Sequence, residues 1–253
     1  MKNNALCLFL VFSSQAIFSD SFTYNSFNNH GVIGLINMPS ARFYNESSYG
    51  FTLYNGDPDQ KITMTSFPYD WMEASFFYMN IEDDQLCRGN VSGQSFCQGY
   101  KDKGFNFKVR LKKEGHFPSI AVGLNDFAGT GLYSSEYIVT SYGVKNIDFH
   151  FGMGWGQLNG HESIKNPLGY ISDRFKNRPA SHTDKGGSFN PDQYFSGTSA
   201  TYFYGISYKF KNNLFVTVRS SATIWHLVPI DLFNSFHPFQ SFSSNPSSIE
   251  IIG

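Results

Sequence analysis

Two carboxylates flank a glycine-rich stretch near the middle of the chain, DFAGTGLYSSEY at residues 126–137. Asp126 precedes the glycines Gly129 and Gly131, and Glu136 follows them. Carboxylates gathered in one loop can serve as general acid and base. Glycines between two strands instead supply the positive φ angles of a tight turn, and an aspartate beside them can accept hydrogen bonds from the turn's N–H groups. The elements around this stretch decide between a catalytic loop, a phosphate cradle and a turn.

Other patterns that could carry chemistry are weak. GMGWG at 152–156 resembles part of a dinucleotide fingerprint, but its glycines alternate along a predicted strand and no helix follows. The neighbours His161 and Glu162 lie in a polar stretch, which favours a solvated pair over a metal site. The sequence contains no GxSxG, HExxH, Walker or CxxC motif. We therefore expect no catalytic residues, no metal and no cofactor, and a protein that is not an enzyme.

The composition favours strands. The 253 residues include 27 phenylalanines, 15 tyrosines and 3 tryptophans, and aromatic residues (18%) outnumber charged ones (15%). Such a composition is typical of β-sheets and unlike disordered chains. The net charge of −1 provides no cationic field for phosphates, so nucleic acid is not expected as a partner.

The N-terminus is typical of a signal peptide, which we assign to residues 1–16. Lys2 gives a short basic region, residues 5–12 are apolar, and a small-x-small cleavage site ends at Ala16. The apolar run is shorter than the ~18 to 20 residues that a spanning helix needs. Cys7 lies inside this run, too early to be a lipoprotein acceptor. The chain is therefore expected to be exported.

Two cysteines, Cys87 and Cys97, remain after the predicted cleavage. They flank a polar loop, CRGNVSGQSFC, and an oxidising compartment favours a disulfide between them. Two free thiols are the alternative. Closing so short a loop would stabilise the fold by about 2 to 3 kcal/mol.

Apolar residues recur with a period of two along much of the chain. In GFNFKVRLK (104–112), Phe105 and Phe107 alternate with Asn106 and Lys108. Such alternation predicts strands with one apolar and one polar face. The expected strands lie near residues 49–56, 60–66, 71–79, 104–112, 118–125, 132–140, 147–156, 201–210 and 214–219. Many match the ~9 to 11 residues of a strand that crosses a bilayer.

The apolar faces are aromatic rather than rich in Val, Ile and Leu, which favours an outer-membrane-type β-barrel over a soluble sandwich. Rings near strand ends, at Trp71, Tyr133, Trp155 and Phe210, are expected to form the interfacial girdles of such a barrel. The long polar stretch from about 157 to 200 is then an extracellular loop or a plug.

FAGTG is accordingly expected to be the turn between two strands. We assign Asp126, Gly129 and Gly131 to turn structure, and by parity place Glu136 in the barrel lumen. If the lumen contacts a glycan, the candidate residues are Lys108, Arg110, Glu136 and His150, because sugars offer hydroxyls that need hydrogen bonds. Salt bridging within the lumen is the alternative role.

Several segments occur in an order that resembles one known family. They are GVIGLINMPSAR (31–42), FPYDWMEASFFY (67–78), YKDKGFNFKVRLKKE (100–114), FPSIAVGLNDFAGTGLYSSEYIV (117–139) and DFHFGMGWGQL (148–158), followed by NP, FKNRP, GG and YFSG pieces. The series resembles the YjbH family, outer-membrane proteins encoded with bacterial exopolysaccharide genes. The resemblance implies a β-barrel that acts in polysaccharide production or export, and it implies no catalytic residues.

Family members are longer than this chain, whose alternation fades after about residue 219. We therefore expect a fragment, a frameshifted reading or a shortened paralogue, and an antiparallel barrel with about 8 to 10 strands present that is incomplete. The expected organisation is a signal peptide (1–16), an N-terminal segment (17–48), a barrel region (49–219) and an irregular tail (220–253).

The function expected is exopolysaccharide production or export at the outer membrane, with the lipid bilayer, the polysaccharide and other envelope proteins as partners. A secreted carbohydrate-binding β-sandwich and a barrel-embedded hydrolase or acyltransferase stay open as alternatives.

Overall fold

The computed structural model describes residues 23–56, 59–89, 95–131, 133–159, 163–179, 191–210, 215–221 and 250–252. For residues 82–89, 95–100, 215–221 and 250–252 it describes the backbone and not the side chains. The predicted signal peptide, His161 and Glu162, and most of the predicted tail lie outside the described residues.

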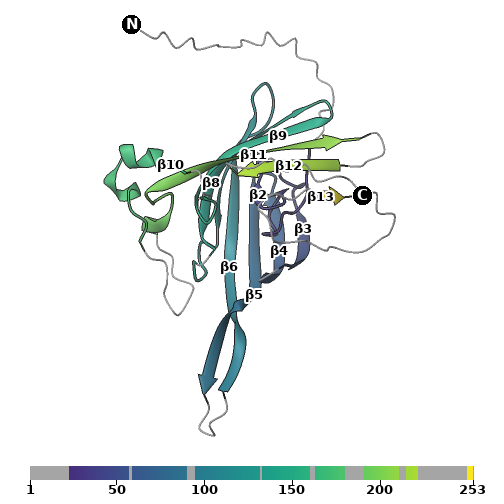
Figure 1. The fold of residues 1–253 in the computed structure, drawn as a ribbon. Helices are drawn as coiled ribbons and strands as arrows, with labels where there is room; N and C mark the ends of the chain where they lie inside the picture. The colour runs from purple at the N-terminus through teal and green to yellow at the C-terminus, as the bar shows by residue number, and fades with distance from the viewer. Residues whose placement is uncertain are drawn as a thin grey trace.

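The described chain forms one large antiparallel sheet, so the prediction of an antiparallel all-β fold is confirmed (Figure 1). Its strands follow the order β13-β12-β11-β9-β8-β7-β6-β5-β4-β3, with β10 paired to β11, and β1 and β2 form a separate ribbon. The strands are β1 (Gly34–Leu35), β2 (Met38–Pro39), β3 (Ser48–Asn55), β4 (Asp59–Tyr69), β5 (Met72–Gly89), β6 (Ser95–Lys112), β7 (Ser119–Asn125), β8 (Ser135–Val144), β9 (Ile147–Gly156), β10 (Ile164–Lys165), β11 (Ser199–Lys209), β12 (Phe215–Ser221) and β13 (Glu250–Ile252). Three short 3₁₀ helices, η1 (Pro167–Tyr170), η2 (Asp173–Phe175) and η3 (Pro191–Gln193), precede β11. None of the helices in the described ranges is long and apolar enough to cross a membrane.

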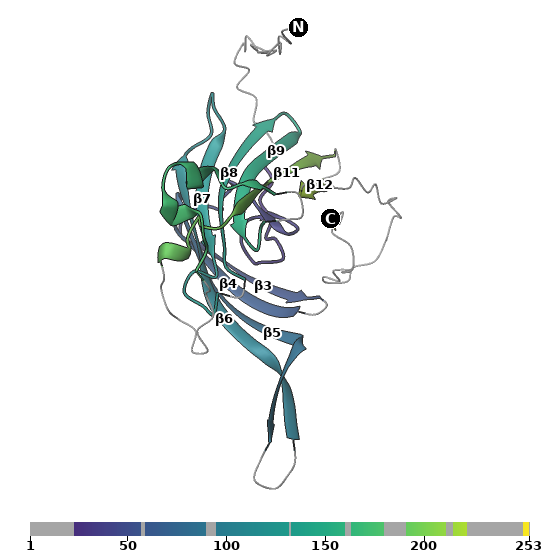
Figure 2. The same cartoon turned by 60° about the vertical axis from the view of Figure 1, so that its left-hand side comes forward.

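The sheet curves but does not close within the described residues. β3 and β13 lie at its two edges, and each pairs with one neighbour, β4 and β12 respectively. Figure 2 shows the curved sheet from the side. The sheet in this part of the chain is therefore no closed barrel, and the incomplete barrel that the sequence predicts is not confirmed by it.

The strands occupy the predicted positions but two of them run much further. β5 and β6 each have 18 residues, where the sequence predicts strands near 71–79 and 104–112. Their outer halves, which contain Cys87 and Cys97, are polar and lack alternation, so no periodic signal marked them. The backbone pairing of this hairpin runs from Met72↔Val109 to Gly89↔Ser95, with a shift of register between Ile81 and Gln85.

Alternation gives the sheet two distinct faces. On the outer face of β6, Phe105 is 45% and Leu111 is 64% exposed, and Phe151 on β9 is 51% exposed. Asn106 and Lys108 point the other way and are 4% and 1% exposed. The parity predicted for 104–112 thus places its apolar side chains outside and its polar side chains inside.

The N-terminal segment, residues 23–47, fills the inside of the curve, where Figure 2 shows it in purple. Ile33, Leu35 and Met38 are at most 1% exposed and pack in one cluster with residues of the sheet. Burial of each such side chain contributes about 1.5 to 3 kcal/mol. Gly34 pairs with Pro39, and a Cβ at Gly34 would lie 2.1 Å from the carbonyl oxygen of Met38. Only glycine therefore permits the tight β1-β2 ribbon of this segment.

The connections at the two ends of the sheet differ. At one end, Asp70-Trp71 and Lys145-Asn146 join β4 to β5 and β8 to β9, and residues 113–118 join β6 to β7. The opposite end, here called the loop end, carries the tip of the β5-β6 hairpin, residues 126–134 and the long connection 157–198.

The register of β5 and β6 generates a prediction about the cysteines. Cys87 and Cys97 are directly opposite each other, and opposite residues of antiparallel strands have Cα atoms about 4.5 to 5.5 Å apart, within reach of a disulfide. Their side chains lie outside the described part of the structure. We expect one Cys87–Cys97 bond in exported protein, seen as a two-hydrogen mass increase of the spanning peptide on reduction. Alkylation of both thiols without reductant would contradict this.

Candidate functional site

A buried ion pair holds the N-terminal segment inside the sheet. Lys108 Nζ on β6 lies 2.6 Å from Glu73 Oε2 on β5, and both side chains are 1% exposed. Lys108 also donates to the carbonyl oxygens of Ile33 (3.2 Å) and Arg42 (2.9 Å), while the Ile33 N–H donates to Glu73 Oε1 (3.1 Å). The pair therefore satisfies backbone groups that would otherwise be buried without partners.

A second ionic cluster surrounds Arg42. Its guanidinium donates to both carboxylate oxygens of Asp148, at 2.9 Å and 2.5 Å, and also contacts Glu114. Burial lowers the pKa of Arg42, but the hydrogen bonds and charge of Asp148, together with Glu114, outweigh it and raise the pKa above its ordinary value. Arg42 is thus a permanent cation that ties the segment to β9.

Ser141, His150 and Asp148 have the residue types of a nucleophile, base and acid. Ser141 Oγ lies 2.8 Å from His150 Nδ1, and His150 Nε2 lies 3.5 Å from Asp148 Oδ2. All three are at most 2% exposed, and Ser141 Oγ accepts the Ala41 N–H while Asp148 binds Arg42. A nucleophile covered in this way cannot meet a substrate, so the trio anchors the N-terminal segment.

The lumen candidates named from the sequence have different positions. Lys108 and His150 face inward but contact the protein's own groups under the N-terminal segment. Arg110 lies 4.4 Å from the centre of the Phe43 ring and 3.6 Å from Asp70. These contacts favour the salt-bridging role over contact with a glycan.

Glu136 lies on the opposite face from the one predicted. It shares the parity of the exposed Ile138, whereas Tyr137 points inward into the core. Arg178 Nη1 and Nη2 bind its carboxylate at 2.8 Å, and the Phe195 N–H donates to it at 2.9 Å. The lumen placement of Glu136 is corrected: the inner face of β8 is apolar because it packs on the N-terminal segment, which reverses the parity signal.

The glycine-rich stretch forms the β7-β8 connection, and its two glycines are required for different reasons. Gly131 has a φ of 79°, and Asp126 itself has a φ of 50°. Gly129 is needed for space, since a Cβ there would lie 2.6 Å from the Lys103 carbonyl oxygen. Asp126 Oδ2 accepts the Tyr133 N–H at 3.1 Å. The two carboxylates do not form a pair: Asp126 lies at the turn and Glu136 binds Arg178.

Asp126 is a buried carboxyl group, 2% exposed. Burial first, and then the nearby charge of Asp102, raise the pKa of Asp126 to about 7. Lys61 and the Tyr133 N–H oppose this shift. The turn thus contains a carboxyl group that titrates near neutral pH.

Asn166 organises the long connection at the loop end. Its Nδ2 donates to the carbonyl oxygens of Phe175 (2.9 Å), Phe195 (3.0 Å) and Gly197 (3.0 Å), and its Oδ1 accepts the Trp155 Nε1–H (2.9 Å). Trp155 is 1% exposed under this loop, so its predicted place in an interfacial girdle is wrong. One amide therefore fixes three parts of the loop to the end of β9.

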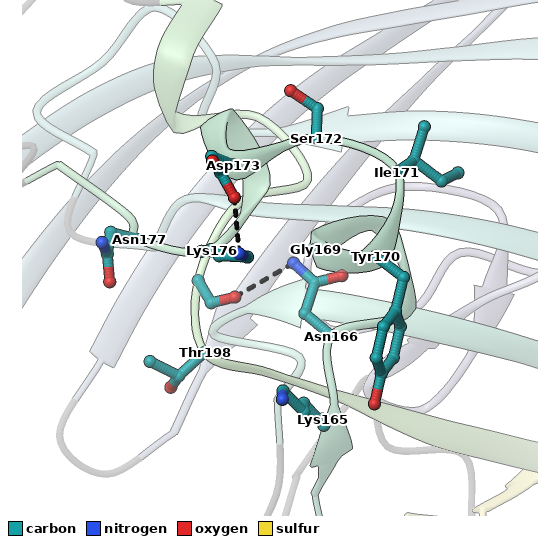
Figure 3. Close-up of a pocket in the computed structure, with 11 residues that line it drawn as sticks. Lys165, Asn166, Gly169, Tyr170, Ile171, Ser172, Asp173, Lys176, Asn177 and Thr198 are labelled. Carbon is teal, nitrogen blue, oxygen red and sulfur yellow. Dashed lines mark hydrogen bonds and ion pairs between the residues drawn. The ribbon is translucent and has the colours of Figure 1, made fainter.

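A pocket of about 800 Å³ opens on the surface of this loop (Figure 3). It is lined by Lys165, Asn166, Gly169, Tyr170, Ile171, Ser172, Asp173, Lys176, Asn177, Gly197 and Thr198. Tyr170 and Ile171 are 75% and 77% exposed, and Lys165 Nζ lies 5.3 Å from the centre of the Tyr170 ring. An ion pair of 2.5 Å joins Lys176 to Asp173. The pocket combines an open aromatic ring with amides, hydroxyls and charges, as sites for polar ligands do.

No group of three or more His, Cys, Asp or Glu side chains that could hold a metal occurs within the described ranges. Sequence reasoning missed Glu73, Asp148 and Arg42, and it missed the pocket altogether. Glu73 and Asp148 do carry a signal, because each is a charged residue at an inward position of an alternating strand. The pocket carries none, since its walls come from irregular chain.

Comparisons with known proteins concern most of the chain. The family model YjbH, described as "Exopolysaccharide biosynthesis protein YbjH", matches residues 26–223. The chain is 32% identical over 212 residues to the "Uncharacterized lipoprotein YjbH" of Escherichia coli (strain K12). That alignment covers 82% of this chain and 30% of the relative, so the chain spans less than a third of the relative's length. No solved structure matches the chain.

Lys108 and Glu73 are expected to contribute to the free energy of unfolding as a coupled pair, so that the effects of changing each one are not additive. Lys108→Met or Glu73→Gln alone should lower the free energy of unfolding by about 3 to 5 kcal/mol, since each leaves the partner buried without its counter-charge. The double variant Lys108→Met/Glu73→Gln should lose clearly less than the sum of the two single losses. Urea unfolding of the full chain, followed by circular dichroism, measures this. Lys113→Met, at a lysine 78% exposed, is the control and should be silent. Additive losses would contradict the coupling.

The raised pKa of Asp126 predicts a pH dependence. The folded state binds this proton more tightly than the unfolded chain, so the stabilisation is complete below pH ~4 and is lost as the pH rises through about 7. Between these values Asp126 should account for a loss of about 2 to 4 kcal/mol. The urea midpoint of the wild type relative to that of Asp126→Asn should fall from pH 4.5 to 8, because the contributions of groups common to both proteins cancel in this difference. Asp173→Asn, an exposed control, should follow the wild type. A difference that does not change with pH would exclude a contribution from this carboxyl group.

Proposed function

Because the chain belongs to the YjbH family of exopolysaccharide biosynthesis proteins, we propose that it acts in the bacterial outer membrane as part of a β-barrel that takes part in producing or exporting an exopolysaccharide. Its partners are the lipid bilayer, the polysaccharide and other envelope proteins of the same pathway. The family supports the link to polysaccharide, and the sheet supports the link to the membrane.

The apolar outer face of the sheet is the observation that best supports the proposed location in the outer membrane. Large apolar side chains exposed on it come from seven strands, β3, β4, β5, β6, β8, β9 and β11. They include Phe51, Leu53, Ile62, Met64, Phe76, Tyr78, Phe105, Ile138, Phe149, Phe151, Tyr202, Tyr204 and Ile206. Soluble monomers rarely expose apolar patches beyond a few hundred Å². A bilayer accounts for such a face because its hydrocarbon core is as apolar as the side chains.

The inner face supports the same interpretation. Lys61, Glu73, Lys108, Asp148 and His150 are all at most 6% exposed, and all face the interior. Outer-membrane barrels alternate apolar residues toward lipid with polar residues toward the lumen, which is the reverse of a soluble sandwich.

The lengths of the connections indicate which end of the proposed barrel faces the outside of the cell. One end of the sheet has two-residue connections at 70–71 and 145–146, whereas the loop end carries the connection 157–198. Outer-membrane barrels have short periplasmic turns and longer extracellular loops. We therefore place the loop end outside the cell.

The proposed barrel requires partners for both edge strands, β3 and β13, because an unpaired edge within a bilayer leaves its backbone groups without hydrogen bonds. Further strands or a second chain would supply them. The relative from Escherichia coli is called a lipoprotein, and this description fits an envelope location for the present chain.

The alternatives are less well supported. A carbohydrate-binding sandwich needs a second sheet over the apolar face, and no strand of the described chain covers it. A barrel-embedded hydrolase needs an accessible nucleophile, whereas Ser141 is 1% exposed beneath Ala41.

A phenylalanine-to-arginine change at two exposed positions, one on the outer face and one in a connection, tests the proposal. Phe105→Arg places a charge on the outer face and should strongly reduce the amount of protein in the outer membrane, because Arg near the bilayer midplane costs ~2 to 4 kcal/mol. Phe117→Arg, at a position 64% exposed in the 113–118 connection, is the matched control and should assemble normally.

Cell fractionation with a carbonate wash, followed by immunoblotting of the outer-membrane pellet, measures both variants. Extraction of the wild type by carbonate, or equal assembly of the two variants, would refute the membrane location.

A further inference from the structure

The pocket of about 800 Å³ at the loop end has the features of a ligand-binding site. We propose that it binds an acidic sugar unit of the polysaccharide, with Tyr170 as the stacking surface and Lys165 as the contact for the sugar's carboxylate. This inference rests on the proposed function, and it names the site and the class of ligand.

The N-terminal segment fills most of the interior of the sheet, and the pocket of about 330 Å³ that remains beside Lys61 and Tyr133 is less than half the size of the loop-end pocket. The side chains of Ile33, Leu35 and Met38 fill the inside of the curved sheet. The ammonium group of Lys108 already binds Glu73 and two carbonyl oxygens. A glycan therefore meets side chains that can respond to it at the loop end, where Tyr170 is 75% exposed.

Tyr170 provides the apolar part of a sugar site. It ends η1 beside Ile171, and both side chains project from the loop (Figure 3). A pyranose ring has an apolar face that packs against an aromatic ring, and the tyrosine hydroxyl can in addition hydrogen-bond to it. A pocket volume of about 800 Å³ accommodates more than one sugar unit.

The charges favour an acidic sugar. Lys165 Nζ lies 5.3 Å from the Tyr170 ring centre, so a positive charge borders the stacking surface. The second ammonium group, on Lys176, pairs with Asp173, but these side chains are 56% and 91% exposed. An exposed pair is worth little and opens readily for a competing carboxylate.

The side chains that line the pocket supply hydrogen-bonding groups, and the loop backbone that carries them, here called the frame, is held in place. Ser172, Asn177 and Thr198 contribute hydroxyl and amide groups. Asn166 holds the frame by binding three backbone carbonyl oxygens and the Trp155 indole, so the frame is formed before a ligand arrives. A preformed site loses less entropy on binding than a flexible loop would.

The chain provides a matched pair for the test. Lys112 Nζ lies 4.1 Å from the centre of the Phe117 ring, so the same lysine–aromatic arrangement occurs at the other end of the sheet, outside the pocket. Isothermal titration of the folded full chain in detergent would compare a hexamer of galacturonate, as the acidic probe, with cellohexaose, as the neutral probe.

Tyr170→Ala should weaken the galacturonate hexamer about three- to tenfold, as loss of an aromatic contact does. Lys165→Gln should weaken it about two- to fivefold while leaving any cellohexaose affinity unchanged, because only the acidic probe carries a charge. Phe117→Ala and Lys112→Gln should have no effect on either probe. Near-ultraviolet circular dichroism checks that each variant is folded.

Absence of galacturonate binding by the wild type, unchanged affinity in Tyr170→Ala, or equal loss in Phe117→Ala would overturn the assignment. Carbonate washing of membranes from cells that express the wild type separates the two hypotheses. A protein that stays in the outer membrane while Tyr170→Ala binds normally refutes the pocket and leaves the proposed function intact. Extraction of the wild type refutes the proposed function, whatever the titrations show.

Discussion

Backbone groups of the N-terminal segment lie inside the curved sheet, out of reach of water, and their need for partners governs the rest of the structure. Glu73 accepts the Ile33 N–H, Lys108 donates to the Ile33 and Arg42 carbonyl oxygens, and Asp148 accepts the Tyr24 N–H. An unpaired buried backbone group costs several kcal/mol in an apolar interior. The charged residues of β5, β6 and β9 therefore face inward because the segment needs them there. The opposite face of the same strands is left to apolar side chains, which is how one constraint produces a two-sided sheet.

The strands could be predicted from the sequence because alternation is a local property. Nine stretches with a period of two correspond to β3 to β9, β11 and β12, and the parity of Lys108 against Phe105 has the predicted sense. The ion pairs could not be predicted in the same way. Glu73 and Lys108 lie 35 positions apart and Arg42 and Asp148 lie 106 apart, so their pairing depends on the register of the sheet and on the position of the N-terminal segment, and no local pattern encodes either.

Glu136 and Trp155 show why the predicted surroundings of particular strand residues were wrong. A parity argument assumes that the apolar side of every strand faces outward, but Tyr137 and Val139 face inward onto Ile33 and its neighbours. The loop then covers the outward side of the same strand ends and buries Glu136 and Trp155 through Arg178, Phe195 and Asn166. Both errors have one physical origin: irregular chain packs on the sheet from each side, and this packing changes which solvent a strand position meets.

The filled interior also constrains how the proposed polysaccharide partner could engage the protein. Passage through the curve of the sheet would require the N-terminal segment to leave, and its departure would break the contacts of Arg42 with Asp148 and of Lys108 with two carbonyl oxygens at the same time. It would also expose a cluster built from Ile33, Leu35 and Met38. These losses act together, so the filled state is strongly favoured over an open one. The loop-end pocket needs no such rearrangement, because Asn166 already holds its frame and Tyr170 already faces solvent. Contact at the rim is therefore the mode of engagement that the folded chain offers at the lowest cost in free energy.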